Sequence, residues 1–138
     1  MNNHAILLDT NLWIYLYTTT PKSQTVKQLI NENFRDIMIS TQILGEMYHV
    51  LTRKNLQSPE AANRIVAKTM ENFAVKEIGI LNVTKAMEIH ACHHYSYWDS
   101  LIIATALLNK VSLLYSEDMQ HNHLIENKIR ILNPFYLM

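Results

Sequence analysis

Four acidic residues occupy positions from which their side chains can meet at one edge of a folded domain. Asp9 directly follows a short apolar run, and Asp118 lies just beyond another. Asp99 stands in the first turn of an apolar helical segment, and Glu46 lies about six residues into the helix that follows the second apolar run. In a parallel sheet the carboxyl ends of the strands, where the chain continues into helices, share one edge, and ligands bind at this edge. We expect the four carboxylates to lie close together at this edge.

Carboxylates gathered in this way repel one another and raise each other's pKa values unless a cation lies between them. Their oxygens suit Mg²⁺ or Mn²⁺, whereas Zn²⁺ prefers histidine or cysteine. Such an ion activates a bound water toward phosphorus, so the pattern predicts metal-dependent hydrolysis of a phosphodiester bond. The predicted catalytic residues are Asp9, Glu46, Asp99 and Asp118. The predicted metal ligands among them are Asp9, Asp99 and Asp118.

Each acid taken alone has a simpler explanation. Aspartate is favoured at a helix start by capping and by the macrodipole, and this is sufficient for Asp9 and for Asp118. Glu46 alone is typical of a solvated helix face. Asp99 is harder to explain away, because an apolar helix leaves its first turn close to the core. The convergence of all four acids is what favours a metal site.

Polar residues near the acids have supporting roles in this interpretation. Thr10, Asn11 and Ser116 can orient carboxylates or metal-bound waters through hydrogen bonds. They suit the roles of turn and cap residues equally well. Arg53 and Lys54, one to two turns beyond Glu46, can contact an RNA backbone, although basic residues at a helix end are favoured by the dipole alone.

Apolar runs and helical periodicities alternate along the chain. Apolar runs predict strands at 5–8, 37–39 and 111–115, and a further strand is expected at 75–81. Apolar residues that alternate with charged ones predict a half-exposed edge strand at 129–131. Capping residues, prolines and 3.6-residue spacing predict helices that begin near 12, 21, 41, 59, 82 and 98. This order is typical of an α/β domain with a mainly parallel sheet and right-handed crossovers.

The composition limits the class of protein. With 138 residues, 49% of them apolar and 17% charged, the chain is expected to form a single domain, 1–138, around one core. Lys and Arg number 12, as do Asp and Glu, so any nucleic-acid contact has to come from a local basic rim. One cysteine excludes an intramolecular disulfide framework, and neither a secretory signal nor a membrane span is recognisable. We expect a cytoplasmic protein without a membrane partner.

Four short motifs resemble, in order and spacing, those of PIN domains. They are Leu8-Asp9-Thr10-Asn11, Ser40 with Glu46, Trp98-Asp99-Ser100 with Ala104, and Tyr115-Ser116-Glu117-Asp118. The resemblance runs nearly end to end, and a chain of this length is similar to the VapC type of toxin, a metal-dependent ribonuclease paired with an antitoxin. It implies a five-stranded sheet in the order 3-2-1-4-5, Mg²⁺ or Mn²⁺ as cofactor, an RNA substrate, a cognate antitoxin and a homodimer.

The chain departs from the resemblance in its fourth motif and in the turn that follows. Glu117 and Asp118 are adjacent acids, either of which can face the metal, and we favour Asp118. Asn122 stands where similar sequences are expected to have glycine. Asparagine tolerates a left-handed backbone, so we expect the turn to be kept.

Other interpretations remain open. His90, Cys92, His93 and His94 offer metal ligands, but a structural zinc site needs four well-spaced ligands. A receiver-like signalling domain also has acids at strand ends and binds Mg²⁺, but the lysine expected after a late strand is missing. A PIN fold without catalysis would be a binding module, and the presence of acids at all four motifs argues against it.

Overall fold

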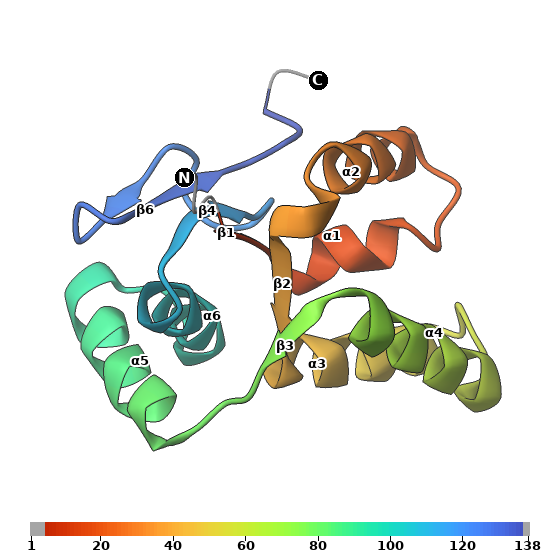
Figure 1. Cartoon of the computed structure of the whole chain (residues 1–138), viewed down its shortest axis with the longest axis horizontal. Coiled ribbons are helices and arrows are strands. Elements are labelled where there is room, and N and C mark those ends of the chain that lie inside the picture. The colour runs from red at the N-terminus through yellow and green to blue at the C-terminus, as the bar shows by residue number, and fades with distance from the viewer. Residues whose placement is uncertain (1–4, 137–138) are drawn as a thin grey trace.

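The computed structural model describes residues 5–136, which form one six-stranded sheet flanked by helices (Figure 1). The strands are β1 (Ala5–Leu8), β2 (Ile37–Ser40), β3 (Ala74–Lys76), β4 (Val111–Tyr115), β5 (Leu124–Ile125) and β6 (Ile129–Leu132). The helices are α1 (Thr10–Tyr15), α2 (Pro21–Glu32), α3 (Thr41–Arg53), α4 (Pro59–Asn72), α5 (Ile80–His93) and α6 (Tyr97–Leu108), and a 3₁₀ turn, η1 (Phe34–Asp36), precedes β2.

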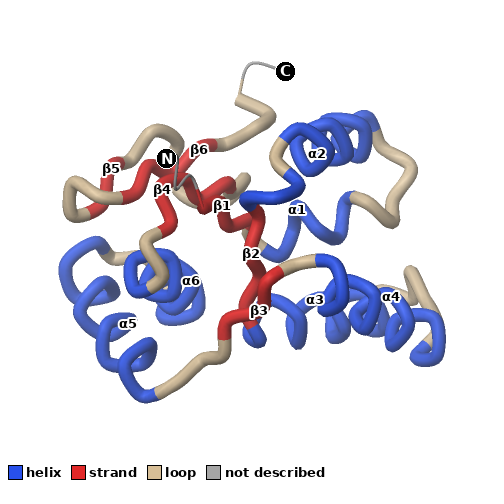
Figure 2. The backbone as a smooth tube through the Cα atoms, in the orientation of Figure 1, coloured by secondary structure: helices blue, strands red, loops and turns tan. Residues whose placement is uncertain are grey.

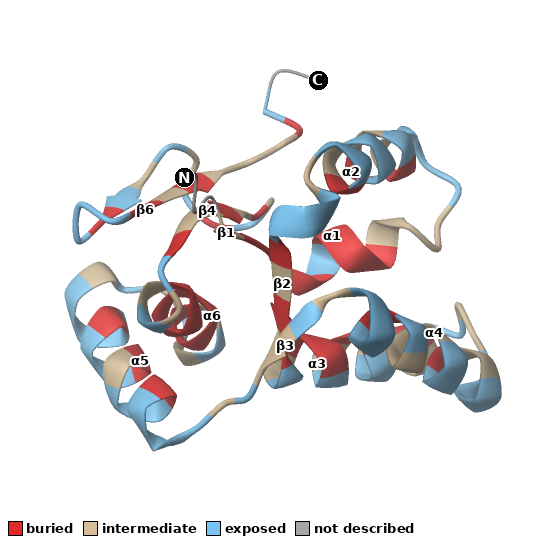
Figure 3. Ribbon diagram, viewed as in Figure 1, coloured by how far each residue is buried: buried red, intermediate tan, exposed pale blue. Residues whose placement is uncertain are grey.

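Helices cover both faces of the sheet. Figure 2 shows α5 and α6 on one side and α1 to α4 on the other. α6 is buried along most of its length because it packs against both α5 and β4, as its colour in Figure 3 shows. This arrangement confirms the predicted α/β class. Within residues 5–136, no helix combines the length and the hydropathy that crossing a membrane requires.

The sheet differs from the prediction at its outer edge. The observed order is β3-β2-β1-β4-β6-β5, with every pair parallel except β5 and β6. The predicted fifth strand is β6, and the additional β5 has only two residues, too few to leave an alternating pattern. The chain reverses between them at Glu126 and Asn127, whose φ angles are 49° and 59°. Lys128 N donates to Ile125 O across this turn (2.9 Å).

The third strand is shorter than predicted, and the next helix begins earlier. The sequence predicts a strand over 75–81, but β3 ends at Lys76 and α5 begins at Ile80. Asn82, the predicted start, lies in the first turn of α5. Its side-chain oxygen accepts a hydrogen bond from Gly79 N (2.9 Å), which caps the helix two residues earlier than predicted.

Serine caps fix the start of two helices at the predicted places. Ser40 Oγ accepts from Ile43 N (3.2 Å) at the start of α3. Ser58 Oγ accepts from Ala61 N (3.1 Å) at the start of α4. Both α2 and α4 have proline at their first position, where the missing N–H leaves no bond unmade.

The loop after β4 keeps the turn expected from its asparagine. Asn122 has a φ of 68°, in the left-handed region, and its N–H donates to Ile131 O (2.7 Å). Closer to β4, Met119 N donates to the buried Ser116 hydroxyl (3.2 Å). The loop that carries the fourth motif is therefore held at both ends.

Candidate active site

Asp9 and Asp118 come to the same edge of the sheet because β1 and β4 are parallel neighbours. Leu8 lies opposite Tyr115 in their register, so the two strands end level with each other. Asp9 N donates to Tyr115 O (2.9 Å), which extends the pairing by one residue before α1 begins. The strand order also reverses between β1 and β4. Sheets of this type bind ligands at such a reversal.

Asp9 is a buried carboxylate with two hydrogen bonds. Its Oδ1 accepts from Thr10 N (2.7 Å), and its Oδ2 accepts from the Ser116 hydroxyl (2.9 Å). Burial raises the pKa of this carboxyl to about 6 in spite of these bonds, and the charges of Asp99 and Glu46 raise it as well. The ionised form of Asp9 is therefore stabilised by any cation that approaches it.

Glu46 reaches the site from the second turn of α3. Its Oε1 accepts from the Thr10 hydroxyl (2.5 Å), and its Oε2 accepts from Gln42 Nε2 (3.2 Å). Gln42 Nε2 also donates to Trp98 O (3.0 Å), so this amide connects α3 to the start of α6. Sequence reasoning missed Gln42. The available signal was its spacing of four residues from Glu46, which places both on one helix face.

Asp99 faces the site from the first turn of α6. Its backbone N–H donates to Ser96 Oγ (3.1 Å), which caps the helix. Partial burial raises the pKa of the Asp99 carboxyl, and the charges of Asp118 and Glu46 raise it further. The structure thus brings the predicted acids close enough to influence each other's ionisation.

The adjacent acids Glu117 and Asp118 have different surroundings. Asp118 Oδ2 accepts from Asn11 Nδ2 (2.7 Å) at the carboxylate edge. Glu117 instead forms an ion pair with Lys22 and accepts from the Tyr15 hydroxyl (2.5 Å). Burial raises the pKa of Glu117, but the hydrogen bonds from Lys22 and Tyr15 outweigh it and hold this pKa below its usual range. Asp118, and not Glu117, is therefore the acid that lies with the other three.

The donor set fits a hard divalent cation. The four acids supply only carboxylate oxygens, which Mg²⁺ and Mn²⁺ prefer, and a bound cation offsets both their burial and their repulsion. Among residues 5–136, no group of three His, Cys, Asp or Glu side chains is arranged as a ready-made ion site. The fit is supported by the chemistry of the donors and by the raised pKa values of Asp9 and Asp99.

The predicted basic contacts lie farther away. Arg53 ends α3, and Lys54 follows it as the capping residue. Both are exposed. Arg53 is two helical turns beyond Glu46, which corresponds to about 10 Å along the axis. The structure leaves the pair at the periphery of the site.

The histidines near the end of α5 do not form a zinc site in the described chain. His90 Nδ1 lies 2.6 Å from Tyr95 O, which occupies one ring nitrogen. The ring of His93 packs edge to face against His123, with centroids 5.3 Å apart. Cys92 is exposed.

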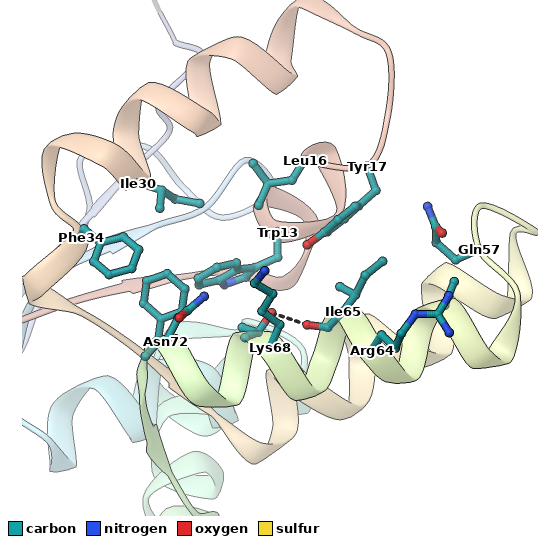
Figure 4. Close-up of a pocket in the computed structure, with 13 residues that line it drawn as sticks. Trp13, Leu16, Tyr17, Ile30, Phe34, Gln57, Arg64, Ile65, Lys68 and Asn72 are labelled. Atoms are coloured by element: carbon teal, nitrogen blue, oxygen red, sulfur yellow. Dashed lines mark hydrogen bonds between the residues drawn. The ribbon is translucent and has the colours of Figure 1, made fainter.

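A groove of about 490 Å³ lies between α1–α2 and α4 (Figure 4). Its wall is largely apolar and aromatic and includes Trp13, Leu16, Ile30, Phe34, Ile65 and Phe73. Arg64 and Lys68 of α4 add positive charge to it. None of the four acids lines this groove, so it is separate from the candidate active site.

Several solved structures share the fold of this chain. VapC20 of Mycobacterium tuberculosis, described as a toxin that cleaves the sarcin-ricin loop, has a TM-score of 0.68 and 22% identity, covering 80% of this chain and 87% of its own. A toxin–antitoxin complex from Klebsiella pneumoniae has a TM-score of 0.72 and 18% identity, with 94% and 98% covered. DNA-bound VapBC from Salmonella typhimurium has a TM-score of 0.72 and 19% identity, with 92% and 96% covered. At these identities the likeness establishes the fold.

No curated protein matches the chain. The PIN domain family, in contrast, matches residues 6–126, a span that contains all four acids. Two of these structural neighbours are VapC20 and a VapBC complex, in agreement with the resemblance of the motifs. We conclude that the chain belongs to the PIN domain family.

Proposed function

We propose that this protein is a metal-dependent ribonuclease that hydrolyses RNA phosphodiester bonds at its carboxylate edge. The observation that carries the proposal is the coupling of the acids: the pKa values of Asp9 and Asp99 are raised by burial and by the other acids of the site. Membership of the PIN domain family and the fold shared with a toxin that cleaves RNA both support a nuclease.

Asp9, Asp99 and Asp118 are the residues that would hold Mg²⁺ or Mn²⁺, with Glu46 beside them. The ion supplies an activated water and offsets the charge on the phosphate. Ionised carboxylates are required for this, so the raised pKa values of Asp9 and Asp99 make occupancy of the site sensitive to pH.

Neighbouring hydroxyl and amide groups hold the acids in place. Thr10 donates through its hydroxyl to Glu46. Ser116 donates to Asp9, and Asn11 donates to Asp118. We propose that these three residues orient the carboxylates, because each side-chain donor fixes one oxygen and leaves the other lone pairs for an ion or a water. Arg53 and Lys54 remain proposed phosphate contacts at the periphery.

The proposal is tested by cleavage of a mixed pool of single-stranded RNA with Mn²⁺ or Mg²⁺. Asp9→Asn and Asp99→Asn should each reduce cleavage by at least a hundredfold, and EDTA should abolish it. Glu60→Gln, an exposed acid on α4, serves as the control and should cleave as the wild type does. Cleavage that survives either aspartate substitution, or that persists in EDTA, would show that the activity does not use this site.

A catalytically silent PIN module is the second candidate function. It requires that the acids bind metal without cleaving RNA. Calorimetry with Mn²⁺ distinguishes the two, because a folded protein that binds the ion through Asp9 and cuts no RNA is a binding module. The receiver-like interpretation is inconsistent with membership of the PIN domain family.

We further propose that the protein is the toxin of a toxin–antitoxin pair, since several structures with this fold are toxin–antitoxin complexes. The groove between α1–α2 and α4 is the proposed contact for the partner. Its apolar wall suits the apolar face of a partner segment, and Arg64 and Lys68 favour acidic residues along that segment's edge. Arg64→Glu with Lys68→Glu should weaken the complex with the product of the adjacent reading frame without affecting RNA cleavage.

A homodimer in the cytoplasm is the remaining part of the proposal. The outer face of α5 carries exposed apolar side chains that suit a contact between two copies, including Ile80 at 84% and Leu81 at 71% exposure. Light scattering of the purified protein determines the oligomeric state, and Ile80→Lys should produce a monomer.

A further inference from the structure

Trp98 is an exposed aromatic residue at the edge of the carboxylate site. Its side chain is 62% exposed, although it directly precedes Asp99 in the first turn of α6. The helix that follows is buried from Ser100 to Ala106. Tryptophan is highly buried on average in folded proteins, so an indole left in solvent at this position indicates a contact surface.

The backbone of Trp98 is fixed by the same group that holds an acid of the site. Gln42 Nε2 donates to Trp98 O (3.0 Å) and to Glu46 Oε2 (3.2 Å). The Tyr97 ring meets the indole edge to face, with centroids 5.0 Å apart and an interplanar angle of 79°. The backbone of Trp98 is therefore joined to Glu46 through one amide group, while much of the surface of Trp98 remains open.

The charge around this indole limits what it can bind. The acids of the site repel the phosphates of RNA until a cation is bound, so affinity for RNA in this region has to come in part from uncharged contacts. Unpaired bases stack on aromatic side chains in proteins that bind single-stranded RNA. Trp98 directly precedes Asp99, and Gln42 joins its carbonyl to Glu46, so its exposed indole offers such a contact.

We propose that Trp98 is a stacking platform for an unpaired base of the RNA, adjacent to the bond that is cut. The inference rests on the proposed ribonuclease function and names the form of its substrate: a single-stranded segment with an unstacked base, and not a continuous duplex. The platform contributes to binding the RNA, whereas the acids act on the phosphate.

The chain contains two tryptophans, and their environments make this proposal measurable by fluorescence. Trp13 is only 2% exposed, and its Nε1 donates to Leu8 O (3.2 Å) inside the core. Quenching by acrylamide therefore acts mainly on Trp98. A base stacked on Trp98 should protect it from the quencher, whereas Trp98→Phe should leave only the constant signal of Trp13.

The experiment uses the Asp9→Asn protein with Mg²⁺, so that RNA is bound but not cut, and a fluorescein-labelled single-stranded RNA. Trp98→Ala should weaken binding by about tenfold, and Trp98→Phe should stay within about threefold of the parent because phenylalanine also stacks. Met70→Ala, an exposed apolar side chain on α4, is the matched control and should bind normally. Polyphosphate, which has charge but no bases, should bind all four proteins alike.

Four results would overturn the proposal. If Trp98→Ala binds RNA as tightly as the parent, stacking on Trp98 is excluded. The proposed ribonuclease function still stands in that case, provided that the wild type cleaves RNA. Equal loss of RNA and polyphosphate binding would indicate a general disturbance of the site. A change of oligomeric state in Trp98→Ala would assign the indole to a contact between proteins. A wild type that neither binds nor cleaves RNA in Mg²⁺ would overturn the stacking proposal together with the ribonuclease function.

Discussion

The substitution Asp9→Asn should stabilise the metal-free protein at neutral pH, although it removes an acid of the proposed active site. The pKa of the Asp9 carboxyl rises from 3.8 to about 6 on folding, chiefly because the group is buried. A raised pKa means that the folded protein binds the proton more tightly than the unfolded chain does. Stability is therefore greatest below pH 4 and is lost as the pH rises through about 6.

The size of this effect follows from the shift. A shift of about two pKa units means that ionised Asp9 lowers the free energy of unfolding by roughly 3 kcal/mol above pH 7. An uncharged asparagine avoids this loss. The asparagine side chain can still accept from Thr10 N, but its amide nitrogen replaces the oxygen that accepts from the Ser116 hydroxyl, a loss of about 1 kcal/mol. The net gain is about 2 kcal/mol, or a rise of about 6 °C in Tm.

Thermal and urea unfolding in EDTA at pH 7.5 and pH 4.5 measure this prediction. The Asn variant should be more stable at pH 7.5, and the difference should vanish or reverse at pH 4.5, where Asp9 is mostly protonated in the folded state. Excess Mg²⁺ should stabilise the wild type more than the variant. Asp and Asn are equivalent as plain helix caps. If the Asn variant is less stable than the wild type at pH 7.5 and the difference is the same at pH 4.5, the assignment of Asp9 as a destabilising buried charge is refuted.

Three further predictions concern metal binding, the two hydrogen bonds of Gln42 and the turn at Asn122. Mn²⁺ affinity should fall by up to about tenfold for each pH unit below 6, because the proton on Asp9 competes with the ion; titration calorimetry that shows no pH dependence would contradict this. Gln42→Leu should lower the rate of RNA cleavage by about tenfold, because it removes the amide that joins Glu46 to the Trp98 carbonyl. An unchanged kcat would show that Gln42 does not position Glu46 for catalysis. Asn122→Ala should cost about 1 kcal/mol in urea unfolding because φ is 68°, whereas Asn122→Gly should stay within about 0.5 kcal/mol of the wild type.

The elements that position the acids could be predicted because their signals are local. β1 is an unbroken apolar run followed by a capping aspartate, and α3 is capped by Ser40, whose hydroxyl accepts from Ile43 N. The parallel order of these elements then places the ends of neighbouring strands at one edge. The approximate position of the site required no more than this.

The parts that sequence reasoning missed depend on contacts between distant residues. β5 exists because it pairs with β6, and two residues carry no pattern of their own. The sequence leaves Glu117 and Asp118 as alternatives with Asp118 favoured, and the distinction depends on Tyr15 of α1 and Lys22 of α2, which bind Glu117 in the loop after β4. The bond of Gln42 to a carbonyl 56 residues away has no local signature.

The two outermost strands of the sheet bear on how this protein behaves when it is alone. β5 has two residues and β3 has three, so each rim exposes very few unpaired amide and carbonyl groups. The tight reversal at Glu126 and Asn127 also puts a charged tip next to one rim. Edge strands as short as these offer few backbone groups with which a strand of a neighbouring chain can form hydrogen bonds. Concentrated protein should therefore resist growth into fibrillar aggregates even when no partner covers its surface.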